Sequence, residues 1–143
     1  MTDLLIGILK NYGLEEVVGK ENNPEIVKMF SELGYDWIKD DETAWCSAML
    51  NYFCMKLGYE RSGKLSARSW LSVGIEVKVP ELGDIVVLWR SNPRSWEGHV
   101  GLFISKNEKK NLIYILGGNQ GNMLSIRPYH ESRVLGYRKT EKI

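Results

Sequence analysis

The stretch His99–Asn119, "HVGLFISKNEKKNLIYILGGN", decides the fold. Two runs rich in β-branched, leucine and aromatic residues flank the turn-forming segment "NEKKN", a pattern typical of a β-hairpin. With the turn centred at Lys109, His99 and Asn119 lie opposite one another on antiparallel strands, about 5 Å apart at Cβ. The stretch therefore predicts an antiparallel sheet and brings two polar side chains together.

The segments around this hairpin predict the rest of the domain. Further β-type runs are "GDIVVLWR" before it and "LSIRPY" and "VLGYRK" after it, with "NQGN" as a second connection. The chain before residue 76 has helical periodicity instead. Helices followed by an antiparallel meander indicate an α+β class, with N-terminal helices packed on one face of a sheet of five or six strands. We expect one domain, 1–143, with a helical segment at 1–40 and a core at 41–143.

Capping residues mark the helices that this class requires. In "NNPEIVKMFSELG", Asn23 can cap, Pro24 occupies the first helical position and Gly34 closes the end. A helix over residues 3–11 precedes it, and one over 43–57 ends at Gly58. In "SARSWLSVG", Ser66 is the expected cap of a short helix.

Composition excludes several classes of function. The chain of 143 residues carries 19 basic and 18 acidic side chains, a net charge of +1, which provides no field to gather nucleic acid. No apolar run approaches the roughly 18 residues of a membrane span. The N-terminal "MTDLLIGILKNYG" lacks the basic segment of a secretory signal, so we expect synthesis in a cytoplasm without export by a signal peptide.

The two cysteines, Cys46 and Cys54, are eight residues apart. On one helix they lie about 12 Å apart along the axis, too far for a disulfide, so we expect free thiols. The chain has no CxxC or HExxH spacing, and we expect neither a metal nor a cofactor.

Cys46, in "DETAWCSAML", is placed to act as a nucleophile. At a helix start, unpaired backbone N–H groups and the helix dipole favour thiolate over thiol. Cys54, two turns further along, lacks this setting. The alternative is that Cys46 is a small buried hydrophobic residue, as most free cysteines are.

His99 can supply the base that a thiol nucleophile needs. On the same strand face, Gly101 lacks a side chain and would let the cysteine helix approach the sheet. Asn119, opposite His99, can accept from the second ring nitrogen and hold the ring. His130, in "RPYHESR", is interpreted as an exposed loop residue, and each of these histidines can also be a structural residue making one hydrogen bond.

Six ordered segments resemble a known family: "DDETAWCSAML", "SARSWLSVG", "PELGDIVVLWR", "EGHVGLF", "LGGNQ" and "RVLGYR". They are similar to a branch of small papain-like peptidoglycan hydrolases related to the NlpC and CHAP cysteine peptidases, many of them encoded in phages and prophages. The resemblance covers nearly the whole chain. It implies a papain-like fold, a nucleophile at Cys46, a base at His99, a third residue at Asn119, and no metal. The backbone N–H of Cys46 would help to hold the oxyanion.

Aromatic and polar side chains near these segments are candidates for substrate binding: Trp45, Trp70, Trp89, Trp96, Gln120, Glu16 and Asp41. Aromatic faces suit sugar rings or stem-peptide contacts, and carboxylates could meet an amine on a peptide stem. The alternatives are core or rim packing for the tryptophans, solvated surface carboxylates for Glu16 and Asp41, and a turn position for Gln120.

Three functions remain open. The leading hypothesis is a monomeric hydrolase that cuts an amide of bacterial peptidoglycan, as an endopeptidase or an N-acetylmuramoyl-L-alanine amidase. It would be a phage endolysin released through a separate pore, or a secreted effector. The second is a cysteine amidase, deamidase or transglutaminase-like toxin acting on wall or protein amides. The third is a catalytically silent wall-binding module.

Overall fold

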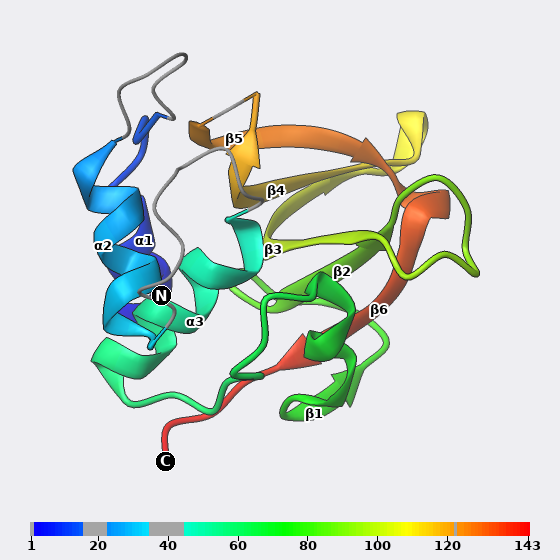
Figure 1. The fold of residues 1–143 in the computed structure, drawn as a ribbon. Helices are drawn as coiled ribbons and strands as arrows, with labels where there is room; N and C mark the ends of the chain where they lie inside the picture. Colours follow the sequence, from blue (N-terminus) through cyan, green and yellow to red (C-terminus); the bar gives the residue numbers. More distant parts are fainter. Residues whose placement is uncertain (1, 16–22, 35–44, 122) are drawn as a thin grey trace.

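The computed structural model describes residues 2–15, 23–34, 45–121 and 123–143, which form helices followed by a six-stranded antiparallel sheet (Figure 1). The helices are α1 (Asp3–Leu9), α2 (Pro24–Glu32), α3 (Cys46–Leu57) and the 3-10 helices η1 (Ala67–Ser72), η2 (Glu108–Lys110) and η3 (Glu131–Arg133). The strands are β1 (Ile75–Val77), β2 (Ile85–Trp89), β3 (Gly98–Asn107), β4 (Leu112–Gln120), β5 (Met123–His130) and β6 (Val134–Lys139). The predicted α+β class is confirmed.

The ends of α2 and α3 follow from their local sequence. The Asn23 side chain accepts a hydrogen bond from the Glu25 N–H at 2.9 Å, and Pro24 occupies the first turn. Gly58 ends α3 in the left-handed region, with φ of 79°. A side chain there would strain the backbone, so glycine fits this C-terminal position.

The segment expected to be a short helix capped by Ser66 is the 3-10 helix η1. The Ser66 side chain makes no cap hydrogen bond. Its carbonyl instead accepts from the Ser69 backbone N–H at 3.2 Å. Likewise, α3 begins at Cys46 within the described part of the chain, so only the 46–57 portion of the helix predicted over 43–57 can be compared.

The central hairpin has the predicted register in the half that lies farther from the turn. Leu102 pairs with Leu116 and Phe103 with Ile115, as a turn centred near Lys109 requires. Beyond Phe103 the ladder shifts by one residue toward the turn. The hairpin prediction is thus confirmed for these pairs, and the irregularity adds local twist.

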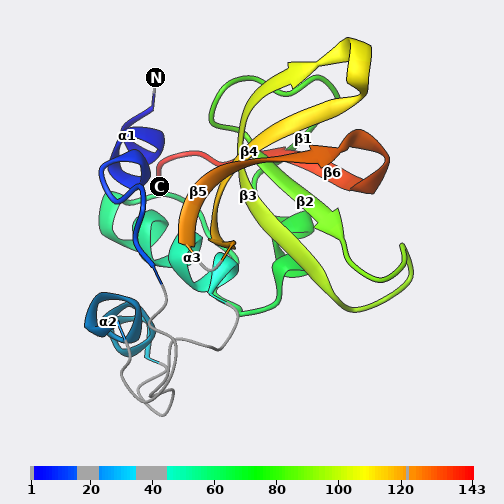
Figure 2. The ribbon, with the colours of Figure 1, turned by 90° about the horizontal axis from the view of Figure 1, so that it is seen from above.

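The sheet is not the simple meander that chain order indicates. Its strand order is β1-β6-β2-β3-β4-β5, so β6 returns to lie between β1 and β2. β1 was not anticipated because its three residues are too short for a periodic pattern. Only β2 to β5 follow one another as neighbours, and β4 and β5 curve strongly (Figure 2).

Apolar residues fill both faces of the sheet. The consecutive residues Val86 and Val87 of β2 belong to different buried clusters, because successive side chains of a strand point to opposite faces. The larger cluster lies between the sheet and the helices, and α3 contacts α1, α2, β3 and β4 (Figures 1 and 2). The smaller one is built around Phe103 on the other face. The start of α3 is therefore fixed against the sheet by packing on several sides.

Within the described ranges, no helix has both the length and the apolar character needed to cross a bilayer.

Candidate active site

Cys46 is the first residue of α3, and its thiol lies against the backbone N–H of Val100 in β3. The N–H groups of Cys46 and Ser47 also act on the sulfur, as expected at a helix start. The residue is only 5% exposed. Burial raises the pKa of the Cys46 thiol, and the N–H groups together with the Arg90 charge offset this only in part. The expectation of a stabilised thiolate is therefore wrong for the resting protein, because desolvation outweighs these contacts.

His99 lies on β3, paired with Leu88 of β2, and is fully buried. Its ring stacks on Tyr129 of β5 with the centroids 5.4 Å apart. Burial lowers the pKa of His99 to about 4, although the hydrogen bond that His99 donates to Gln120 raises it, and Arg90 and Arg133 lower it further. The imidazole is neutral at pH 7, which is the form a general base needs.

Gln120 fixes which ring nitrogen carries the proton. The Gln120 amide nitrogen donates to the carbonyls of Ile115 and Ser125 at 3.0 and 2.7 Å, so its oxygen is the atom that faces the ring. This oxygen lies 2.8 Å from His99 Nε2 and can only accept, so Nε2 carries the hydrogen. His99 Nδ1 is then a lone-pair acceptor, buried and without a hydrogen-bond partner in the described part of the chain.

The residue that holds the imidazole is thus Gln120, where the sequence pointed to Asn119. The β4–β5 ladder is irregular between Gly117 and Gln120, and Asn119 takes a left-handed conformation with φ of 57°. This irregularity ends the simple alternation of side chains, so the register that pairs 102 with 116 does not continue to 99 and 119. No hydrogen bond joins Asn119 to the ring among the described residues.

Two glycines before this irregularity make room for the site. A Cβ on Gly117 would lie 2.8 Å from the Gln120 amide oxygen and 3.3 Å from His99 Nε2. A Cβ on Gly118 would lie 2.6 Å from the ring of Trp45. The segment "LGGNQ" is therefore glycine-rich because a side chain would push apart the imidazole–amide pair and the residue before Cys46. That is the sequence signal that could have located Gln120.

The glycine expected to admit the cysteine helix has another role. A Cβ on Gly101 would lie 2.5 Å from Ile115 Cγ2 and 2.6 Å from the Leu116 carbonyl, both on β4. Val100 and not Gly101 packs into the helix-side cluster, and the His99 ring stacks on Tyr129. The thiol therefore reaches the sheet at the peptide N–H that directly follows His99. No hydrogen bond links sulfur and ring in the described structure.

The tryptophans proposed for substrate binding separate into two groups. Trp45 and Trp70 are buried, at 1% and 0% exposure, so neither presents a ring to a ligand. Trp70 Nε1 donates to Ser47 Oγ at 2.8 Å, which fixes η1 to the first turn of α3. Trp96 is 83% exposed and remains available. Trp89, partly buried at the end of β2, lies under the guanidinium of Arg133.

Glu16 and Asp41 lie outside the described residues. His130 is exposed at the end of β5, where its ring accepts from the Ser132 N–H at 3.2 Å as the cap of η3.

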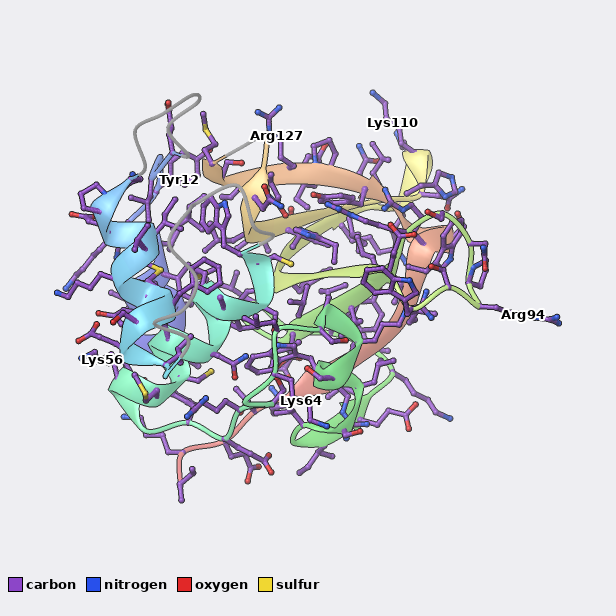
Figure 3. All side chains as sticks on the ribbon, in the orientation of Figure 1. Tyr12, Lys56, Lys64, Arg94, Lys110 and Arg127 are labelled. Carbon is purple, nitrogen blue, oxygen red and sulfur yellow. The ribbon has the colours of Figure 1, made fainter. Side chains whose placement is uncertain are left out.

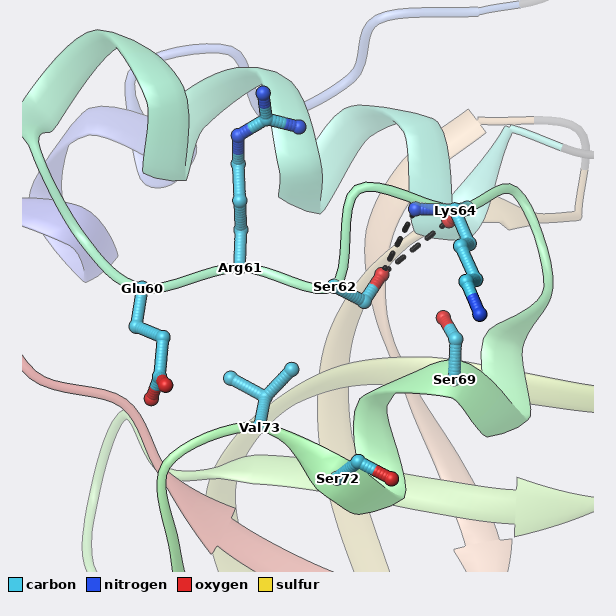
Figure 4. A pocket seen from close by; sticks show the side chains of 7 residues that line it. All are labelled: Glu60, Arg61, Ser62, Lys64, Ser69, Ser72 and Val73. Atoms are coloured by element: carbon cyan, nitrogen blue, oxygen red, sulfur yellow. Dashed lines mark hydrogen bonds between the residues drawn. The ribbon is translucent and has the colours of Figure 1, made fainter.

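A cavity of about 220 Å³ lies between η1 and the loop that leads to it (Figure 4). Its lining consists of Glu60, Arg61, Ser62, Lys64, Ser69, Ser72 and Val73. Ser47 connects this loop to the candidate site, since its hydroxyl donates to the Lys64 carbonyl at 2.7 Å. Neither Cys46 nor His99 lines the cavity, which is therefore distinct from the candidate site.

Comparison with known proteins gives no family: no family model matches the chain, and no curated protein matches it significantly.

Proposed function

We propose that the protein is a cysteine amide hydrolase in which Cys46 is the nucleophile, His99 the base and Gln120 the residue that positions the base. One observation supports this most strongly. A buried, neutral imidazole has its Nε2–H held by Gln120 and its Nδ1 without a partner, beside the backbone N–H that contacts the Cys46 thiol. An unsatisfied buried polar atom is costly, and it persists where a site uses it.

In the proposed reaction, Nδ1 of His99 takes the thiol proton as Cys46 Sγ attacks the carbonyl carbon of an amide. The C–N bond then breaks, the imidazolium gives its proton to the leaving amine, and a thioester remains. Water, deprotonated by Nδ1, attacks the thioester, and the Cys46 thiol is regenerated. Because both groups are neutral at rest, proton transfer accompanies attack, with no preformed thiolate–imidazolium pair.

The oxyanion of this reaction would form at the start of α3. The backbone N–H of Cys46 is one donor, and a helix N-terminus favours negative charge there.

We propose bacterial peptidoglycan as the substrate and a papain-like arrangement as the fold class, on the basis of the six ordered segments that resemble the NlpC- and CHAP-related hydrolases. The helix-then-sheet order with a cysteine at a helix start supports this. A monomeric phage endolysin released through a separate pore is the form we favour. A secreted effector would be accompanied by an immunity gene.

The experiment compares purified wild type, Cys46→Ala and Cys54→Ala on peptidoglycan sacculi, followed by turbidity and by mass spectrometry of the released muropeptides. We expect wild type and Cys54→Ala to release the same products and Cys46→Ala to release none. Clearance that survives Cys46→Ala, or no clearance by any variant across several wall chemistries, would contradict the proposal. Deamidation of protein substrates by wild type alone would favour the toxin hypothesis.

A further inference from the structure

The cavity between η1 and the loop that leads to it has walls that buried polar side chains hold in place. Asn51 of α3 is only 2% exposed, and its Oδ1 accepts from the Gly63 N–H at 2.8 Å while its Nδ2 donates to the Lys64 carbonyl at 3.0 Å. The buried ring of Trp70 holds η1 to α3 in turn, through its hydrogen bond to Ser47. Because α3 fixes both walls, the cavity keeps its shape without a ligand.

Two side chains of opposite charge line this cavity, Glu60 and Lys64, and Val73 lies between them in the view of Figure 4. The Gly74 N–H donates to Glu60 Oε2 at 2.7 Å, which orients the carboxylate, and Oε1 has no hydrogen-bond partner within the described ranges. The Lys64 ammonium forms no ion pair with any described residue. The cavity therefore offers a fixed carboxylate at one end and an unpaired ammonium at the other.

The remaining lining suits an uncharged polar group between these two charges. Ser72 Oγ has no hydrogen-bond partner in the described structure, and Ser69 Oγ donates to a backbone carbonyl but keeps its lone pairs as acceptors. Arg61 adds no third charge at this position, because its side chain runs from the loop toward α3 (Figure 4) and its charge acts on the Cys54 thiol. The volume of about 220 Å³ is below the roughly 300–1,000 Å³ of sites for drug-sized ligands, so the ligand is small.

We propose that this cavity binds a short peptide of dipeptide size with both termini free. The ammonium end of the peptide pairs with Glu60 and the carboxylate end with Lys64, and each pair is a charge-assisted hydrogen bond. The Ser72 hydroxyl can donate to the carbonyl of the central amide, and Ser69 Oγ can accept from its N–H. The flexible four-carbon stem of Lys64 lets the ammonium follow the carboxylate of the peptide.

The test titrates isotope-labelled wild type with L-alanyl-L-alanine, while NMR follows the backbone amides of residues 60–74. Two matched peptides each lack one charge: the N-acetylated form lacks the ammonium, and the C-terminal amide lacks the carboxylate. We expect saturable shifts of these backbone amides with alanylalanine. Each blocked peptide should bind about fivefold more weakly, because it loses one charge pair, and the difference should fall as salt is raised.

Each charge of the cavity has its own variant. Glu60→Gln keeps an acceptor for the Gly74 N–H and should abolish the preference for the free ammonium, so that alanylalanine and its N-acetylated form bind alike. Lys64→Met should abolish the preference for the free carboxylate in the same way. The control is Lys110→Met, because Lys110 lies on η2, away from Lys64 (Figure 3), and should change neither preference.

Shifts that do not saturate, shifts confined to the surroundings of Cys46 and His99, or blocked peptides that bind as tightly as alanylalanine would overturn the inference. So would preferences that persist in Glu60→Gln and Lys64→Met. The result is independent of the proposed hydrolysis, since neither Cys46 nor His99 lines the cavity. A wild type that clears no sacculi but shows both charge preferences would contradict only the proposed function.

Discussion

Cys46 and Cys54 occupy the same helix, and both are buried. Cys54 lies in the interior of α3 at 0% exposure, and burial raises its pKa to about 12. Cys46 lies at the helix start, where backbone N–H groups, including that of Val100, and the Arg90 charge oppose the effect of burial. The two residues share a desolvation cost and differ in what surrounds the sulfur. Position on the helix, more than burial, distinguishes a candidate nucleophile from a core residue.

The groups that surround the two cysteines also differ. Next to the sheet position that Cys46 contacts is an imidazole with a free Nδ1, fixed by Gln120. Within the described ranges, the charged group that acts on the Cys54 thiol is Arg61. We therefore expect substitutions at the two cysteines to have effects of different kinds.

The largest expected effect is on turnover. Cys46→Ala should lower kcat/KM for amide hydrolysis on the order of 10³-fold or more, because no thioester can form. Cys54→Ala should keep kcat/KM and instead lower the free energy of unfolding by about 1–2 kcal/mol, since it removes a packed sulfur. Steady-state kinetics and urea unfolding measure the two effects. Equal losses of activity in both variants would remove the distinction.

The buried imidazole of His99 should make the free energy of unfolding depend on pH. The folded pKa of His99, about 4, lies below its ordinary 6.5, so protonation favours the unfolded chain. The free energy of unfolding therefore keeps its full value above about pH 6.5. It falls progressively as the pH is lowered toward 4, by up to about 3 kcal/mol.

Urea unfolding between pH 4 and 7.5 tests this sign, alongside the NMR titration of His99. The control is His130→Gln, which removes an exposed histidine and leaves His99 in place, so the pH dependence due to His99 should persist. If the free energy of unfolding instead rises as the pH falls from 6.5, the buried imidazole is charged in the folded protein.

Next in size is the effect of removing the residue that positions the imidazole. Gln120→Ala should lower kcat about 10²-fold with little change in KM, because the ring loses its fixed tautomer while the nucleophile stays. The NMR signals of the imidazole nitrogens should then show both neutral tautomers.

Asn119→Ala is the matched control, and it should leave the tautomer and kcat unchanged. The reverse outcome, with Asn119→Ala the damaging variant, would restore the assignment made from the hairpin register.

The smallest expected effect is on thiol reactivity. Iodoacetamide should modify Cys46 about tenfold faster than Cys54, because backbone N–H groups and a nearby cation stabilise only the first thiolate. Both rates should be slow at pH 7, since burial raises both pKa values. Peptide mass spectrometry at several times gives the two rates, and faster modification of Cys54 would contradict the comparison.

The segment around Gln120 shows where reasoning from sequence reached its limit. The segment "NEKKN" located the turn of the hairpin, and Phe103 and Ile115 pair as expected, while the pairs nearer the turn are shifted by one residue. Extending that register to residue 119 assumed a regular strand. The irregularity between Gly117 and Gln120 depends on pairing with β5 and on close contacts with Trp45 and His99. None of these contacts is local in sequence.

The sequence by itself determined the helix-then-sheet class, the caps at Asn23 and Gly58 and the centre of the main hairpin, because neighbouring residues settle backbone conformation there. Only the tertiary structure decided that Gln120 holds the imidazole, that Trp45 and Trp70 are core residues and that the Cys46 thiol is neutral. Burial and cross-strand contacts set these properties, and both depend on segments that are distant in the chain.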